Sequence, residues 1–367
     1  MMGEYRPLGP SWERPLTSGE LRGRLVAGVA LSQPLVPARK LGNGSELYDF
    51  SGAMGCGCGR PSVCVLGAFD GVHVGHRALV RAAVDEARER GLVSIAVTFS
   101  PDPAALLAGP IVNDTLLAVE DRVRMLSRLG LDAVLVVPFT RELAATSHET
   151  FLREWLVASV SPVSIHVGAD FRMGAGGAGT VAALRVVAGP LGIDVHGHEL
   201  VSEHGRAVSA TLVRGLIRDG RVEDAARLLC RDHMVRGVVE HGRGEGASFG
   251  FPTANVRIDA SVCLPAEGVY AALVCDGSHA WPAAVNVGVP PTFAGQSAPD
   301  TRTLLEANLI GFAGDAYGRV AHVTFVRWLR DSRSFSSLEE LERTVRGNIG
   351  WTARSLGEGN VMGGGAV

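Results

Sequence analysis

The stretch GAFDGVHVGH, residues 67–76, decides the fold of the N-terminal part of this chain. It follows the apolar run SVCVLG and precedes apolar residues at helical spacing, from Leu79 to Ala87. This order predicts a buried strand that turns directly into a helix. The unpaired amides at such a helix start attract phosphate. His73 and His76, with Gly75 between them, can then hydrogen-bond to phosphate oxygens and stabilise charge developing on them.

Outward from this turn, the sequence predicts two domains. Strand-length runs at 62–67, 92–99, 132–139 and 163–168 alternate with helical segments, which predicts a doubly wound, Rossmann-like α/β domain over residues 62–230. From residue 231, short strand-like runs punctuated by Gly, Pro and Asp predict a small antiparallel β-barrel with a C-terminal helix, over residues 231–352. We expect residues 1–61 to be a poorly ordered N-terminal extension and residues 353–367 a Gly-rich tail.

The amino-acid composition excludes two common classes of ATP-binding site. The 367 residues contain 35 Lys+Arg and 38 Asp+Glu, and Lys40 is the only lysine. A P-loop and a protein-kinase site both need a lysine on the phosphates, so neither can follow residue 40. Any ATP site must therefore use His, Arg, backbone amides and metal. The net charge of −3 and the lack of a basic run predict no nucleic-acid partner. Apolar stretches are short and no signal peptide is visible, which predicts a cytoplasmic protein without a membrane partner; the oligomeric state stays open.

A second stretch with candidate functional residues is HGRGEGASFGFPTANV, residues 241–256. Gly242, Gly244 and Gly246 permit backbone conformations that can wrap a phosphate tail without lysine. The Thr253 hydroxyl and the Asn255 carbonyl are hard oxygen ligands that suit Mg²⁺. Taken alone, a Gly-rich turn in an antiparallel barrel is usually only a turn.

The complete string resembles the G-x-x-L-G-F-P-T-A-N segment of riboflavin kinases, with Phe249 in place of the usual Leu. Residues 268–274, 283–293 and 304–341 resemble the later segments of that family in the same order. The resemblance places Glu306 on the catalytic glutamate of the family. It also implies Gly242 and Gly246 as nucleotide-binding residues and Thr253 and Asn255 as metal ligands.

The H-x-G-H motif resembles the nucleotidyltransferase superfamily. Residues 208–229 resemble the I-S-S-T-x-I-R segment of bacterial FMN adenylyltransferases, and residues 167–179 resemble their G-x-D/N-F-R-F-G block. Asp102 stands where that family usually has His, and Ala210 where it has a second Ser. The resemblance implies His73 and His76 as catalytic residues, with the remaining roles divided between nucleotide binding (Gly67, Phe69, Asp70, Gly75, Ser209, Thr211 and Arg214) and flavin binding (Asp170, Phe171 and Arg172).

Together the two motifs resemble the bifunctional riboflavin kinase/FMN adenylyltransferase family, the bacterial FAD synthetases. The resemblance implies that the barrel phosphorylates riboflavin with Mg-ATP and that the α/β domain adenylylates FMN with ATP, releasing pyrophosphate. The implied partners are these small-molecule substrates, with Mg²⁺ as cofactor. Two alternatives stay open: a riboflavin kinase whose adenylyltransferase domain is degenerate, and a non-catalytic flavin- or nucleotide-binding regulator.

Three further patterns contain residue types that are typical of binding sites. Cys56 and Cys58 flank one glycine, and a flexible loop with reduced thiols is favoured over a metal site. His196 and His198 share one face of a strand and could bind zinc together with His204, but solvated strand histidines are favoured. The glycines at 174, 176 and 179 match G-x-G-x-x-G without a tight strand-to-helix turn, so a flexible loop is favoured over a dinucleotide site.

Overall fold

The computed structural model describes residues 16, 20, 21, 24, 35–52, 59–108, 115–241, 251–277, 279–288, 304–333 and 335–362. The chain divides into two compact units. The α/β unit is Leu35–Ala210, and the barrel unit combines Met1–Pro34 with Thr211–Val367. Among the described residues, no helix has the length and apolarity that crossing a bilayer requires.

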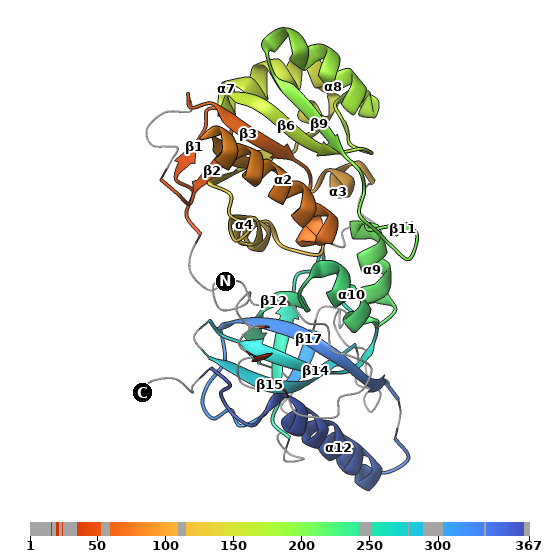
Figure 1. Ribbon diagram of the computed structural model, residues 1–367. Coiled ribbons are helices and arrows are strands. Elements are labelled where there is room, and N and C mark those ends of the chain that lie inside the picture. The colour runs from red at the N-terminus through yellow and green to blue at the C-terminus, as the bar shows by residue number, and fades with distance from the viewer. Residues whose placement is uncertain are drawn as a thin grey trace. The chain divides into compact units, whose positions relative to one another are not determined.

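A seven-stranded sheet in the order β1-β2-β5-β4-β3-β6-β9 forms the centre of the α/β unit (Figure 1). Five neighbouring strands are parallel, and β1 and β2 add antiparallel at one edge. The strand order reverses at β3, which lies between β4 and β6. In such a sheet, ligands bind beyond the carboxyl ends of the strands at the reversal, which is where the H-x-G-H turn lies. The strands are β1 (Arg39–Lys40), β2 (Glu46–Asp49), β3 (Ser62–Leu66), β4 (Val93–Ser100), β5 (Ala133–Pro138), β6 (Pro162–Gly168) and β9 (Asp194–His198).

Helices cover both faces of this sheet. On one face, α2 (Val74–Arg90) packs against β3, β4 and β6, and α4 (Val119–Ser127) packs against β5. The opposite face packs against η2 (Phe151–Leu156), α7 (Val157–Val160) and α8 (Val181–Ala188) in one apolar core. The doubly wound prediction is therefore confirmed. The shorter elements of the unit are η1 (Asp70–Val72), α3 (Pro103–Ala108), α5 (Arg141–Ala145), α6 (His148–Thr150), β7 (Arg172–Met173), η3 (Ala175–Gly177), β8 (Gly179–Thr180), η4 (Gly189–Leu191), β10 (Ser202–Glu203) and β11 (Arg206–Ala207).

The barrel unit contains a closed barrel in the order β12-β13-β16-β15-β14-β17, and every neighbouring pair is antiparallel. Its core includes Tyr270 and Phe325, both fully buried. The antiparallel-barrel prediction is confirmed. The strands are β12 (His233–Glu240), β13 (Ala254–Ile258), β14 (Gly268–Cys275), β15 (Ala280–Val287), β16 (Leu304–Leu309) and β17 (Val320–Asp331), and the helices are α9 (Ala210–Arg218), α10 (Val222–Leu229) and α12 (Leu338–Leu356).

The structure corrects the expected N-terminal extension. Strands β1 and β2 belong to the sheet, and β2 pairs with β5. Leu21 is buried in an apolar cluster of the barrel unit, and the Arg24 Nη1 donates to Asp232 Oδ1 over 2.6 Å. These segments are too short to show a periodic pattern, and their partners lie far away along the chain.

The domain boundary and the expected tail also differ from the prediction. The division falls at Thr211 rather than Arg231, because α10 packs against β12 and β17 and its Val222 lies in the barrel core. At the other end, α12 continues to Leu356, and the Val361 amide donates to the Ala280 carbonyl over 2.8 Å. Residues 353–362 are thus part of the packed unit.

Candidate active sites

The H-x-G-H turn is tightly folded at the end of β3. Phe69 and Val72 adopt φ angles of 54° and 45°, so the backbone reverses within a few residues. His73 then caps α2, since its Nδ1 accepts a hydrogen bond from the His76 amide over 3.4 Å. The two imidazole rings stack with their centroids 3.7 Å apart. The turn therefore brings both predicted catalytic histidines to the start of one helix.

Two glycines leave room for these rings. A Cβ atom on Gly75 would lie 3.2 Å from the His73 ring, and a Cβ on Gly67 would lie 3.1 Å from the Phe69 ring. Larger residues at either position would push the neighbouring ring out of place. This steric requirement accounts for both glycines, and their predicted role in nucleotide binding stays a prediction.

Burial keeps the histidine pair uncharged. It lowers the pKa of His73 to about 4 and the pKa of His76 well below its ordinary value. The Nδ1 atom of His76 is buried without a hydrogen-bond partner among the residues that the structure describes. At neutral pH both rings are thus neutral, and each can donate one hydrogen bond to an anionic oxygen.

A buried arginine behind the turn escaped the sequence analysis. The Nη1 atom of Arg122, on α4, donates to the Ala68 carbonyl and to Thr98 Oγ1, the latter over 3.1 Å. Burial lowers the pKa of Arg122, while Asp70 and Asp102 act in the opposite direction through their negative charge. The sequence of α4 holds four charged residues, Glu120, Asp121, Arg122 and Arg124, so it gives no signal that marks Arg122 as the one behind the turn.

The two carboxylates near Arg122 also have structural partners. Asp70 Oδ1 accepts from the Leu116 amide over 2.9 Å and from the Leu117 amide over 3.2 Å. Asp102 Oδ1 accepts from the Ala104 amide over 2.8 Å, at the first turn of α3. Asp102, the residue that departs from the family pattern, is therefore a buried helix cap beside a positive charge.

The other residues predicted for the adenylyltransferase half are spread over several elements. Asp170 and Arg172 are exposed after β6, and Phe171 packs against the apolar core of the α/β unit. Ser209 is exposed at the end of the α/β unit. Thr211 and Arg214 lie on α9 in the barrel unit. Their flavin- and nucleotide-binding roles stay predictions.

In the barrel, strand pairing brings the predicted kinase residues together. Asn255 on β13 is the direct partner of Glu306 on β16, and Glu306 is also the direct partner of Asn286 on β15. Direct partners in a sheet project to the same face. Their chain neighbours Leu305 and Val285 lie in the barrel core, so this polar row is on the outer surface. Asn286 was missed by the sequence analysis, because only the strand register places it next to Glu306.

The segment before β13 is held close to this row. Thr253 comes two residues before Asn255, and both are half-buried. Asn308 Nδ2 donates to the Pro252 carbonyl over 2.9 Å, which ties the segment to β16. The hydroxyl of Thr253 and the amide oxygen of Asn255 are the hard oxygen donors that Mg²⁺ prefers, so this donor set fits the ion.

Several predicted positions lie outside the described residues. These are Gly242, Gly244, Gly246, Phe249, Cys56 and Cys58.

Two family models match this chain, one in its N-terminal part and one in its C-terminal part. Residues 58–212 match the FAD synthetase family model, and residues 229–356 match the riboflavin kinase model. The bifunctional riboflavin kinase/FMN adenylyltransferase of Escherichia coli strain K12 is 35% identical over 300 residues, which cover 82% of this chain and 93% of that protein. The chain belongs to the bifunctional riboflavin kinase/FMN adenylyltransferase family. It is a transferase that contains both halves of the two-step synthesis of FAD from riboflavin.

Other relatives agree with this family membership. The protein of the same name from Bacillus subtilis strain 168 is 30% identical over 286 residues, covering 77% of this chain and 89% of that protein. The structure also resembles the crystal structure of a macrolide-efflux protein from Streptococcus pneumoniae. That match has a TM-score of 0.71 and 29% identity, and covers 80% of this chain and 94% of the other.

Proposed function

We propose that the Asn286–Glu306–Asn255 row phosphorylates riboflavin and that the His73–His76 pair assists adenylylation of the resulting FMN. The observation that supports this division most directly is the pairing register of the barrel. It places a carboxylate between two amide side chains on adjacent strands. A base next to oxygen-donor ligands is the arrangement that phosphoryl transfer to an alcohol requires.

In the kinase half, Glu306 accepts the proton of the ribityl 5′-hydroxyl of riboflavin. The oxygen of that hydroxyl forms a bond to the γ-phosphorus of ATP. The bond from that phosphorus to the β,γ-bridging oxygen breaks, and ADP leaves. Thr253 and Asn255 would hold Mg²⁺, which when bound neutralises charge on the β- and γ-phosphates. The tie between Asn308 and Pro252 keeps the Thr253 segment against β16.

In the adenylyltransferase half, a phosphate oxygen of FMN forms a bond to the α-phosphorus of ATP, and pyrophosphate leaves. The reaction needs no nucleophile from the enzyme. The neutral rings of His73 and His76 donate hydrogen bonds to the phosphate oxygens as negative charge redistributes, and the N-terminus of α2 adds its positive dipole.

The position of Arg122 near Asp102 favours an active adenylyltransferase domain over a degenerate one. A carboxylate at position 102 would repel phosphates if its charge were unopposed. The charges of Asp102 and Arg122 interact, and both side chains are buried. The positive charge offsets part of the repulsion, so the departure at this position is compatible with AMP transfer.

One assay tests the proposal against both alternatives. The purified chain is incubated with riboflavin, ATP and Mg²⁺, and FMN and FAD are separated by chromatography. We expect both products, with FMN appearing first. FMN without FAD would indicate a kinase with a degenerate second half, and neither product would indicate a non-catalytic binding protein.

A further inference from the structure

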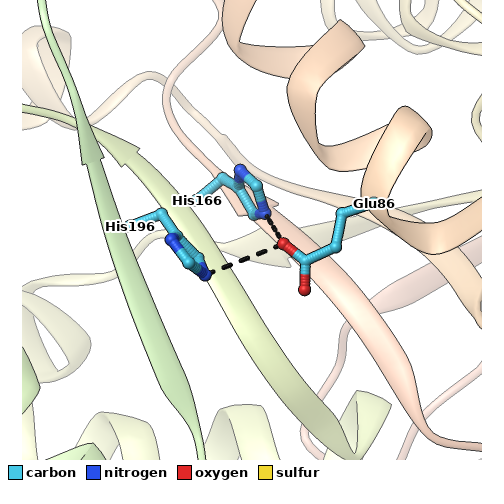
Figure 2. Close-up of side chains that lie close together, drawn as sticks. All are labelled: Glu86, His166 and His196. Carbon is cyan, nitrogen blue, oxygen red and sulfur yellow. Dashed lines mark hydrogen bonds and ion pairs between the residues drawn. The ribbon is translucent and has the colours of Figure 1, made fainter. Parts of the chain in front are cut away.

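A second cluster of histidines lies elsewhere in the α/β unit. Glu86 on α2, His166 on β6 and His196 on β9 point toward one another (Figure 2). His166 and His196 are direct partners in neighbouring parallel strands. Glu86 lies ten residues after His76, about 15 Å further along the same helix. The cluster is therefore separate from the histidine pair of the H-x-G-H turn.

The sheet directs both imidazoles to the helix. Ile165 and Val195, which precede these histidines, lie in the apolar core on the opposite face. Since successive side chains of a strand alternate between faces, His166 and His196 project toward α2 and its Glu86. Three elements distant in sequence thus place their donor atoms in one location.

The donor atoms are spaced closely enough for a single ion. Glu86 Oε2 lies 2.7 Å from His166 Nε2 and 3.7 Å from His196 Nε2. All three ligand atoms lie within 4.8 Å of one another. Around tetrahedral Zn²⁺, ligand atoms at about 2.0–2.2 Å from the metal lie about 3.3–3.6 Å apart. The His196 side chain is 48% exposed and can make most of the adjustment by rotating.

Neighbouring groups orient these ligands. Arg90 Nη1 donates to Glu86 Oε1 over 2.6 Å, which leaves Oε2 directed at the histidines. His166 Nδ1 and His198 Nε2 are 2.9 Å apart and share one proton between them. When the proton is on His166 Nδ1, the lone pair of His166 Nε2 is available to a metal ion. Such outer partners commonly fix the tautomer and direction of a ligating histidine.

We propose that Glu86, His166 and His196 bind a divalent transition-metal ion such as Zn²⁺, with His198 as the outer partner of His166. Two imidazoles and a carboxylate suit Zn²⁺ and its neighbours in the first transition row, whereas Mg²⁺ and Ca²⁺ prefer oxygen ligands. The exposed side next to His196 leaves a coordination position for water. The ion would clamp the edge strand β9 to α2.

This site differs from the zinc site considered from sequence. His204 lies in the turn between β10 and β11, where its Nε2 is 3.9 Å from Glu203 Oε1 and its side chain is 89% exposed. It contributes nothing to the cluster. His198 is half-buried and hydrogen-bonded to His166, so it is not a solvated strand histidine.

Metal titration of the full-length chain tests the proposal. After treatment with EDTA, the wild type, His196→Gln, Glu86→Gln and the matched control His204→Gln are titrated with Zn²⁺ by calorimetry, and with Co²⁺ by visible absorption. We expect the wild type and His204→Gln to bind one ion that His196→Gln and Glu86→Gln do not bind. His198→Gln should bind it about 10–100-fold more weakly, because it loses only the outer partner.

Two readouts separate ligation from a general loss of structure. The intense visible absorption of four-coordinate Co²⁺ should appear in the wild type and His204→Gln but not in His196→Gln or Glu86→Gln. Zn²⁺ should raise the Tm of the wild type and of His204→Gln but not that of His196→Gln. Circular dichroism checks that His196→Gln is folded. Equal stoichiometry and equal Co²⁺ spectra in the wild type and His196→Gln would overturn the proposal.

Discussion

His73 and His76 stack ring on ring, with their centroids 3.7 Å apart at the first turn of α2. Because desolvation lowers both pKa values and keeps both rings neutral, the pair presents hydrogen-bond donors without adding positive charge to the site. Selectivity for a phosphate must then come from geometry and from the helix terminus rather than from a charged side chain.

The first prediction concerns this pair. His73→Ala removes one donor and the cap of α2, so FAD formation from added FMN should fall by about 10²–10³-fold, the usual loss for a donor to a developing anion. Riboflavin phosphorylation should be unchanged, because it takes place in the barrel unit. Product chromatography measures both steps, with His204→Gln as the control. Unchanged FAD output from His73→Ala would contradict the role given to the H-x-G-H turn.

Glu306 provides the converse experiment. Glu306→Gln keeps the size of the side chain and removes the base, so FMN formation should fall by at least about 10²-fold. Added FMN should still be converted to FAD at the wild-type rate. Glu358→Gln, an exposed position in the same unit, is the matched control. If the rates of FMN formation and FAD formation fell equally in Glu306→Gln, the assignment of the two reactions to separate units would be wrong.

Substitutions of Arg122 and Asp102 test whether the positive charge of Arg122 offsets the negative charge of Asp102 behind the H-x-G-H turn. Asp102→Asn keeps an oxygen that can cap α3, so the KM for FMN should change by no more than about threefold. Arg122→Gln leaves Asp70 and Asp102 buried without the nearby positive charge, and should lower the free energy of unfolding by about 3 kcal/mol. Steady-state kinetics and urea unfolding provide the two measurements. A large gain in FMN affinity for Asp102→Asn would show that its charge is not offset.

Buried His233 predicts a pH-dependent stability of the barrel unit. Its pKa is lowered to about 4 by burial, while an unfolded chain titrates it near its ordinary value of 6.5. The unfolded state therefore takes up the proton first. Stability is full above about pH 6.5 and declines as the pH falls toward 4, with a loss of about 2 kcal/mol at pH 5.

Urea unfolding at pH 7 and pH 5 measures this loss. Trp281, Trp328 and Trp351 lie in the barrel unit and Trp155 lies in the α/β unit, so tryptophan fluorescence in a Trp155→Phe background follows the barrel unit. His233→Asn keeps a donor for the Cys263 carbonyl, which His233 Nε2 approaches to 2.9 Å, and should reduce the pH dependence. His279→Gln, at an exposed position, should leave it intact. A pH dependence that is the same in wild type and His233→Asn would assign the effect to other groups.

Local signals predicted most of the fold. The apolar runs and helical stripes around residues 62–168 give the parallel sheet, because periodic burial is encoded within each element. The start of α12 is also encoded locally, because the Glu340 amide donates to Ser337 Oγ, three residues earlier, over 3.2 Å. The H-x-G-H turn was predictable for the same reason, since all its parts are contiguous.

Pairings across long separations were not predictable. Glu86 and His166 are 80 residues apart and meet only because α2 packs over β6. Asn286 is recognisable as part of the Asn286–Glu306–Asn255 row only through the strand register that pairs it with Glu306. Strand β2 is four residues long, and its place beside β5 depends on a partner almost ninety positions away. No single-sequence periodicity carries such information.

The ion pair between Arg24 and Asp232 joins two parts of the barrel unit that are far apart in the chain. Leu21 and Arg24 belong to the barrel unit, the α/β unit follows from Leu35, and the chain returns to the barrel unit at Thr211. The adenylyltransferase is thus inserted between an N-terminal anchor and the body of the kinase. A kinase fragment cut at Thr211 would lose the guanidinium that faces the buried Asp232 carboxylate. A kinase fragment that keeps this ion pair therefore needs the segment around Arg24 as well as Thr211–Val367.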